Sequence, residues 1–446
     1  MSERRKVLEL FEQQKDYIEE RLNYGIENYR KTNATIILKD KDGNLVKNAK
    51  IAVKLTKHEF KYGTNLFMLD ELETKEKNDL YKKHMSSFGN IATLPFYWNA
   101  NEPQKGNTRY KKGSERIYRR PPIDLCLEFC EEHGIEPREH GLAYENFFPE
   151  WLYGASVEDI KKHLKKRCKE ISALYANKIP TIEVTNEMSW AEGKTAFYDA
   201  PDYVEWCFKI AEEYFPNNQL VINEMSGLAW CDRCRATDKY YAYIEANMLK
   251  GARIDAIGMQ FHQFAKRENE YNETRAYFNP KNLYKHMDLY SNFKKPLQIT
   301  EITVPSYSWE PEDEAIQAEI IEYLYKIWFS HASVEQIIYW NLVDGYAHVW
   351  AQNPEEIRKI QGNMTVGENY YYGGLLRFDL SPKPAYYVIK NLFEKVWHTE
   401  EELVLDGDGK AEFKGFYGDY EAIIDGETYN FSLKKNNENI FSITLN

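Results

Sequence analysis

Alternating apolar and amphipathic stretches fill most of this 446-residue chain. Short runs rich in Val, Ile and Leu predict buried strands, and segments with apolar residues three or four positions apart predict helices. Between residues 61 and 398, strands are expected at 61–68, 91–97, 137–144, 181–187, 219–224, 255–262, 297–304 and 335–343. Each is followed by enough residues for a covering helix, so the pattern predicts a (β/α)8 TIM barrel of the α/β class.

The helices of this barrel are expected where amphipathic segments follow the strands. They are predicted at 73–86, 121–133, 156–176, 201–215, 235–250, 280–291, 312–330 and 383–395. The segment 345–380 is rich in Tyr and Gly, and we expect it to be a long loop over the mouth of the barrel.

The two ends of the chain have a different pattern. Residues 1–30 predict a charged N-terminal helix, and 31–60 predict a β-hairpin whose strands, 34–39 and 50–56, meet at the turn K-D-G-N. Residues 399–446 predict short strands separated by turns rich in Asp, Asn and Gly. We therefore expect a small all-β accessory domain, a sandwich built from both ends. It is either a structural clasp or a sugar-binding module.

Composition and charge limit the partners. The net charge is −12 and no basic run is interleaved with aromatic residues, so nucleic acid and anionic membranes are poor candidates. No apolar window is long enough to span a membrane, and residues 1–20 lack a signal-like apolar core, so we expect a cytoplasmic protein. Aromatic residues make up 15% of the chain, which suits both sugar stacking and an ordinary core.

The cysteines do not indicate a disulfide framework. There are six, and Cys231 and Cys234 form a CxxC with neither a second CxxC nor a nearby histidine pair. We interpret this pair as structural thiols and not as a zinc site.

Chemistry concentrates where the predicted strands end, which is where TIM barrels build their active sites. These positions supply carboxylates, amides and aromatic rings, with His262 at the rim. There is no His-x-His, no two-His-one-carboxylate group, no glycine-rich phosphate loop and no G-x-S-x-G elbow, so no metal and no cofactor are expected.

Two glutamates stand out because each ends an apolar strand. Glu187 closes the stretch T-I-E-V-T-N-E and Glu301 closes L-Q-I-T-E. Glycoside hydrolysis needs two such carboxyl groups, one on each side of the bond that breaks. Asn186 would bind a sugar hydroxyl, His262 would hydrogen-bond Glu301 and keep it ionised, and Trp340 would form a floor for the sugar. Any one of these residues alone is more simply a salt-bridged or core residue, but together they favour a site.

Several motifs resemble glycoside hydrolase family 10, best known for endo-β-1,4-xylanases. The family's V-V-N-E, G-M-Q-x-H and I-T-E motifs correspond here to V-T-N-E at 184–187, G-M-Q-F-H at 258–262 and I-T-E at 299–301. The resemblance covers about 61–397. It implies that Glu187 is the acid/base, that Glu301 is the nucleophile and that configuration is retained.

The chain departs from the family at the glycone side. Where the family typically has T-P-E-N-x-M-K-W, residues 92–98 read A-T-L-P-F-Y-W and keep only Trp98. The family's W-H-S-Q becomes Y-E-N-F at 144–147, so Glu145 is expected to replace a sugar-binding His, and Thr303 stands where an Asp usually partners the motif histidine. These changes predict an altered glycone preference. The residues expected to contact substrate are Asn65, Trp98, Tyr144, Glu145, Asn186, Gln260, His262 and Trp340.

We therefore predict a retaining hydrolase of β-linked glycans, acting on xylan or xylo-oligosaccharides. The alternatives are a β-glycosidase acting on a modified oligosaccharide or plant glycoside, and a carbohydrate-binding protein without catalysis. Endo or exo action and the oligomeric state are left open by the sequence.

Overall fold

The computed structural model describes residues 3–190, 192–231, 234–349, 356 and 359–445. Its main body is a closed barrel of eight parallel strands in the order β10-β3-β4-β5-β6-β7-β8-β9. The strands are β3 Lys61–Asn65, β4 Ile91–Pro95, β5 Glu136–His140, β6 Thr181–Asn186, β7 Gln219–Glu224, β8 Ala256–His262, β9 Leu297–Thr303 and β10 Val334–Tyr339. The predicted barrel is confirmed.

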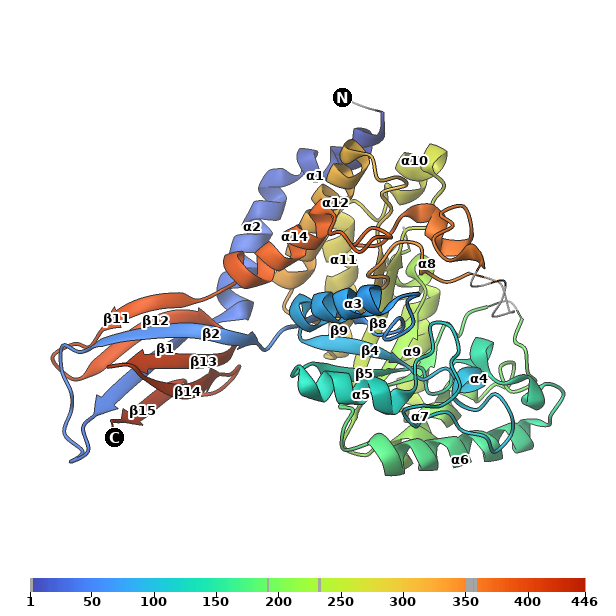
Figure 1. Cartoon of the computed structure of the whole chain (residues 1–446), viewed down its shortest axis with the longest axis horizontal. Helices are drawn as coiled ribbons and strands as arrows, with labels where there is room; N and C mark the ends of the chain where they lie inside the picture. Colours follow the sequence, from blue (N-terminus) through green and yellow to red (C-terminus); the bar gives the residue numbers. More distant parts are fainter. Residues whose placement is uncertain (1–2, 191, 232–233, 350–355, 357–358, 446) are drawn as a thin grey trace.

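Helices surround the barrel (Figure 1), which explains why its strands read as continuous apolar runs: both faces are buried. The long helices are α3 Lys75–Phe88, α5 Ile123–Glu132, α6 Val157–Tyr175, α7 Tyr203–Tyr214, α9 Lys239–Leu249, α11 Pro280–Tyr290, α12 Pro311–Ser330 and α14 Pro384–Asn391, the last continued by the π-helical turn η8 Leu392–Val396. None of the helices in the described ranges is both long and apolar enough to cross a membrane.

Short helices lie in the loops that follow the strands. They are α4 Trp98–Asn101, η3 Glu145–Phe147, η4 Glu150–Leu152, α8 Ser226–Ala229, η5 Arg267–Asn269, α10 Glu270–Thr274, η6 Ser291–Phe293 and η7 Gly367–Tyr371. The last belongs to the long segment predicted at 345–380, and Glu368 within it lines the barrel mouth as expected.

The predicted N-terminal helix is not continuous. It consists of η1 Arg4–Leu8, α1 Glu9–Gln13, α2 Lys15–Gly25 and the π-helical turn η2 Ile26–Arg30, with a break at Gln14. Phe11 stacks on Tyr323 of α12, with ring centroids 4.7 Å apart. Gly25 approaches α12 so closely that a β-carbon there would lie 2.1 Å from the carbonyl oxygen of Ser330, so only glycine fits.

The accessory domain has two sheets that combine strands from both ends of the chain, and it lies beside the barrel (Figure 1). One sheet has the order β12-β1-β15 and the other β11-β2-β13-β14. Their strands are β1 Lys31–Lys39, β2 Lys50–His58, β11 Glu400–Val404, β12 Lys410–Phe416, β13 Gly418–Ile424, β14 Glu427–Leu433 and β15 Ile440–Thr444.

The predicted hairpin within 31–60 is wrong. The turn forms, since Asp40 Oδ1 accepts the backbone N–H of Asn44 at 2.8 Å, but the chain then crosses from one sheet to the other. β1 pairs with β12 and β15, whereas β2 pairs with β11 and β13. The alternating apolar residues of both strands are buried, and placing them in different sheets allows each strand to cover the core from its own side.

Candidate active site

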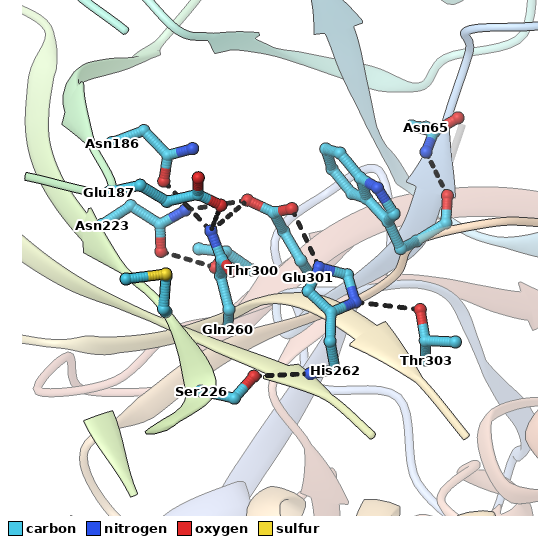
Figure 2. Close-up of polar contacts among 12 residues, drawn as sticks. Asn65, Asn186, Glu187, Asn223, Ser226, Gln260, His262, Thr300, Glu301 and Thr303 are labelled. Carbon is cyan, nitrogen blue, oxygen red and sulfur yellow. Dashed lines mark hydrogen bonds and ion pairs between the residues drawn. The ribbon is translucent and has the colours of Figure 1, made fainter. Parts of the chain in front are cut away.

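A cavity of about 900 Å³ opens at the carboxyl ends of the barrel strands. The predicted residues that line it are Tyr144, Asn186, Glu187, Gln260, His262, Glu301 and Trp340. Figure 2 shows several of these side chains converging from neighbouring strands. The cavity is thus formed by the strand ends on which the sequence analysis placed the chemistry.

The two predicted glutamates face each other across one amide group. Nε2 of Gln260 lies 3.0 Å from Oε1 of Glu187 and 3.2 Å from Oε1 of Glu301 (Figure 2). The two carboxylate oxygens are therefore no farther apart than the sum of these distances. Two carboxyl groups that share one donor lie close together, as double displacement requires, whereas inverting glycosidases separate theirs by roughly 6.5–9.5 Å.

Glu301 accepts hydrogen bonds on both carboxylate oxygens. Nδ2 of Asn223 donates to Oε1 at 3.0 Å, alongside the Gln260 amide, and Nε2 of His262 lies 3.2 Å from Oε2. The predicted contact with His262 is present, but its expected consequence is not. Burial outweighs the donors and, with the nearby carboxylates of Glu183 and Glu187, raises the pKa of Glu301 to about 8.

Burial and the negative charges of Glu183 and Glu187 both disfavour a charge on Glu301, so the free protein favours the protonated form of Glu301 at neutral pH. Double displacement requires one protonated and one ionised carboxyl group, so Glu301 must lose its proton before it acts as the nucleophile.

The substitution Glu301→Gln is expected to stabilise the folded protein at neutral and alkaline pH. Below pH 4.5, the ordinary pKa of glutamate, folded and unfolded chains both hold the proton. As the pH rises toward 8 the unfolded chain releases this proton while the folded protein keeps it. The wild type therefore loses roughly 1.4 kcal/mol of unfolding free energy per pH unit relative to the variant.

Denaturant unfolding of both proteins at pH 4, 6 and 8 measures this difference, with the exposed Glu310→Gln as the control. Identical pH dependence of wild type and Glu301→Gln would contradict the raised pKa.

Glu187 leaves its strand in a left-handed backbone conformation, with φ of 52°. Its Oε2 accepts hydrogen bonds from the hydroxyl of Tyr144 and, at 3.1 Å, from Nε1 of Trp190. Asn186 accepts from the Gln260 amide at 3.2 Å and so fixes the amide that bridges the two glutamates. A non-glycine residue in this conformation is strained, and here the strain accompanies a side chain placed in the cavity.

The structure identifies the partner of His262. Its Nδ1 lies 2.9 Å from Oγ1 of Thr303, the residue that replaces the Asp usual in the family (Figure 2). Burial lowers the pKa of His262, so the imidazole is neutral and has one donor and one acceptor. When Glu301 is ionised its carboxylate can only accept, so Nε2 donates to it and Nδ1 accepts from the threonine hydroxyl. The hydroxyl of Thr303 can donate as well as accept, so it supports this tautomer, and the ionised carboxylate of Glu301 selects it.

Three of the predicted contact residues, Asn65, Trp98 and Glu145, do not line the cavity. Trp98 is buried and donates from Nε1 to Glu102 at 2.9 Å, whereas its neighbour Tyr97 lines the cavity. Asn65 donates to the carbonyl of Trp340 and so supports the predicted sugar floor from behind.

The prediction that Glu145 replaces a sugar-binding histidine is also wrong. The residue is 1% exposed, and its carboxylate accepts the backbone N–H groups of Lys194 at 3.1 Å and Thr195 at 2.6 Å. Glu145 therefore fixes the loop that follows Glu187. It does not reach the cavity.

The histidine on this wall of the cavity is His140, which the sequence analysis missed. Its Nε2 lies 3.0 Å from the hydroxyl of Tyr97, and its Nδ1 lies 2.6 Å from Oε1 of Glu183. Glu183 also pairs with the buried Arg138, and although burial opposes it, these two partners lower the pKa of Glu183. The sequence offered one signal for this network, namely charged residues within strands that are otherwise buried.

His140, Glu183 and Glu301 each offer a ligand atom, all within 4.8 Å of one another. A divalent cation there would lie beside the guanidinium of Arg138, which already neutralises Glu183. The donor set therefore suits an ion-pair network that orients His140 better than it suits a metal.

A closed parallel barrel with two carboxyl groups at its strand ends, close enough to share one donor, is the arrangement typical of retaining glycoside hydrolases. Comparison with known proteins gives the family: the model for glycosyl hydrolase family 10 matches residues 54–392. The chain belongs to this family.

Its relatives include two kinds of protein. The anti-sigma-I factor RsgI6 of Acetivibrio thermocellus is 26% identical over 427 residues, covering 93% of this chain and 48% of that protein. The β-1,4-xylanase of Dictyoglomus thermophilum is 24% identical over 52% of this chain and 68% of that protein. This chain therefore spans about half the length of the anti-sigma factor.

Solved structures share the fold. Xylanase 10B of Thermotoga maritima matches with a TM-score of 0.56 at 22% identity, covering 76% of this chain and 96% of that chain. Xylanase 10B of Thermotoga petrophila RKU-1, in complex with xylobiose, matches with the same TM-score and identity, and the match covers 76% of this chain and 95% of that chain.

Proposed function

We propose that this protein hydrolyses β-linked glycans with retention of configuration, and that xylan or xylo-oligosaccharides are its substrate class. The observation that carries the proposal is the single Gln260 amide bonded to both Glu187 and Glu301. Carboxyl groups about 5–5.5 Å apart are typical of double displacement, since no room remains for a water molecule to attack directly.

In the first step Glu301 attacks the anomeric carbon and the glycosidic C–O bond breaks, while Glu187 gives its proton to the departing oxygen. Tyr144 and Trp190 donate to Glu187 and hold its carboxyl group on the leaving-group side. In the second step Glu187, now ionised, takes a proton from water, and the resulting attack on the same carbon releases Glu301. Two inversions give overall retention.

The choice of xylan rests on the relatives. The Dictyoglomus protein is named a β-1,4-xylanase, and the Thermotoga petrophila structure contains xylobiose. The cavity also offers half-exposed aromatic rings suited to stacking on sugars, at Tyr153, Trp190 and Phe264.

The test is proton NMR of the new reducing ends while the protein acts on xylohexaose. We expect the β-anomer to appear first and the α-anomer only as mutarotation proceeds. First appearance of the α-anomer would contradict double displacement, and intact xylohexaose would contradict the substrate class.

A second candidate is sugar recognition without turnover. It is favoured by the RsgI6 match, which extends over the accessory sheets as well as the barrel and whose protein is named an anti-sigma factor. Binding of xylohexaose to the wild type by calorimetry, without any cleavage over days, would favour this function.

A further inference from the structure

Two arginines, Arg119 and Arg120, line the same cavity as the carboxyl pair. They lie in the loop between α4 and α5, and only 5% and 8% of their respective surfaces are exposed. Cations buried this deeply are normally paired with an anion. Within the ranges that the structure describes, neither guanidinium forms an ion pair with a carboxylate.

The guanidinium of Arg120 lies over the aromatic ring of Tyr97. Its Cζ is 3.6 Å from the ring centroid of Tyr97, and Nη1 donates to the carbonyl of Arg119 at 2.9 Å. Nε and Nη2 have no partner among the described residues. Burial lowers the pKa of Arg120 to about 10, so the group is still charged at neutral pH. The N–H groups on Nε and Nη2 of this planar guanidinium are thus available to a ligand.

Arg119 is held more tightly. Its φ is 59°, and its Nη1 donates to Oδ1 of Asn341 at 3.0 Å and to the carbonyl of Tyr346. Its Nε is buried without a partner among the described residues. Glu368 is an acidic residue that lines the same cavity. Nδ2 of Asn341 donates to its carboxylate at 3.1 Å, so the side-chain amide of Asn341 links Arg119 to Glu368.

This cationic wall lies beside the reaction centre. The ring of Tyr97 that carries Arg120 reaches His140 through its hydroxyl at 3.0 Å, and Nδ1 of His140 lies 4.0 Å from Oε1 of Glu301. The leaving group is met by Glu187 and Trp190. The arginines therefore face the sugar that Glu301 attacks or the next one on that side.

We propose, building on the glycosidase function above and narrowing its substrate class, that Arg119 and Arg120 bind an anionic group on the glycone and that an acidic β-glycoside is preferred over its neutral counterpart. An oxyanion on the exocyclic carbon of the sugar, either a uronosyl carboxylate or a phosphate ester, would accept from both guanidinium groups. Arginine forks match both groups in geometry, and charge-assisted bonds are strongest where water is excluded. The anion would also balance two buried positive charges.

A series of 4-nitrophenyl β-glycosides that differ at one carbon tests this assignment. The xyloside lacks the exocyclic carbon, the glucoside carries a hydroxymethyl group, and the glucuronide and the 6-phosphoglucoside carry the two anions. We expect one acidic glycoside to exceed the glucoside at least ~10-fold in kcat/KM, and its identity distinguishes carboxylate from phosphate ester.

Arg120→Gln is expected to lower kcat/KM for the preferred acidic glycoside by ~100-fold and for the glucoside by less than ~3-fold. Lys112→Gln is the matched control. It removes one positive charge from the same loop at an exposed residue paired with Glu128, and both substrates should react as with the wild type.

The possible failures are distinguishable. Turnover of the xyloside or glucoside with no acidic preference in the wild type overturns the anion site and leaves the glycosidase function standing, even if Arg120→Gln does not fold. Where no glycoside is cleaved, calorimetry with methyl β-glucuronide and methyl β-glucoside 6-phosphate decides. Binding that is lost in Arg120→Gln supports the anion site without catalysis, and no binding overturns it.

Discussion

Glu301→Ala is expected to abolish turnover of an aryl β-xyloside, with a loss of ~10⁴-fold or more in kcat, while the protein stays folded. Glu301 would form the covalent bond to the anomeric carbon, and no neighbouring carboxylate can replace it because Glu183 is committed to Arg138 and His140. Steady-state kinetics and circular dichroism of the variant measure the two parts of this expectation.

Azide makes the test for Glu301 specific. A small anion that enters the space left by the carboxylate should attack the anomeric carbon once and give an α-glycosyl azide. The exposed Glu310→Ala, in the loop after the same strand, serves as the control and should retain full activity. Substantial turnover by Glu301→Ala without azide would remove the nucleophile assignment.

Glu187→Ala is expected to affect substrates according to their leaving groups. A xylobioside needs a proton on its departing oxygen, so its kcat/KM should fall by ~10²–10⁴-fold. The dinitrophenolate of a 2,4-dinitrophenyl xyloside leaves without needing a proton, so the first step should still proceed. The glycosyl-enzyme should then accumulate, and the dinitrophenolate should be released in a burst. Added azide should then yield a β-glycosyl azide, because the intermediate is attacked from the face that Glu187 has vacated.

The control for Glu187 is the exposed Glu192→Ala in the same loop, which should leave both substrates unaffected. Equal losses of kcat/KM for both leaving groups would contradict the acid/base role of Glu187. Formation of an α-glycosyl azide by Glu187→Ala would indicate that Glu187 is the nucleophile and Glu301 the acid/base.

Much of the site could be predicted because catalytic strand ends carry local signatures. Asn186 next to Glu187 and Gln260 near His262 each terminate a buried strand, and the alternation of such strands with helices fixes which residues reach the barrel mouth. Which side chain of a neighbouring pair faces the cavity was not predictable. Tyr97 and Trp98 adjoin in sequence, and only the turn after β4 decides that the tyrosine lines the cavity.

Long-range contacts account for the other corrections. Glu145 is withdrawn from the cavity by the backbone N–H groups of Lys194 and Thr195, some fifty residues farther along the chain. The strands on either side of the Asp40 turn join different sheets because their partners come from the C-terminal segment. Neither outcome has a signal within the local pattern of polar and apolar residues.

By itself the sequence determined the barrel, the combination of both chain ends in one β domain, and the placement of Glu187 and Glu301 at the mouth of the barrel, because these follow from local periodicity and from motifs at strand ends. Only the tertiary structure decided the raised pKa of Glu301, the hydrogen-bond partners of His262 and the convergence of Arg119 and Arg120 on the same cavity. The physical reason is that desolvation and charge interactions depend on which groups surround a side chain in space, and segments far apart along the chain supply those groups.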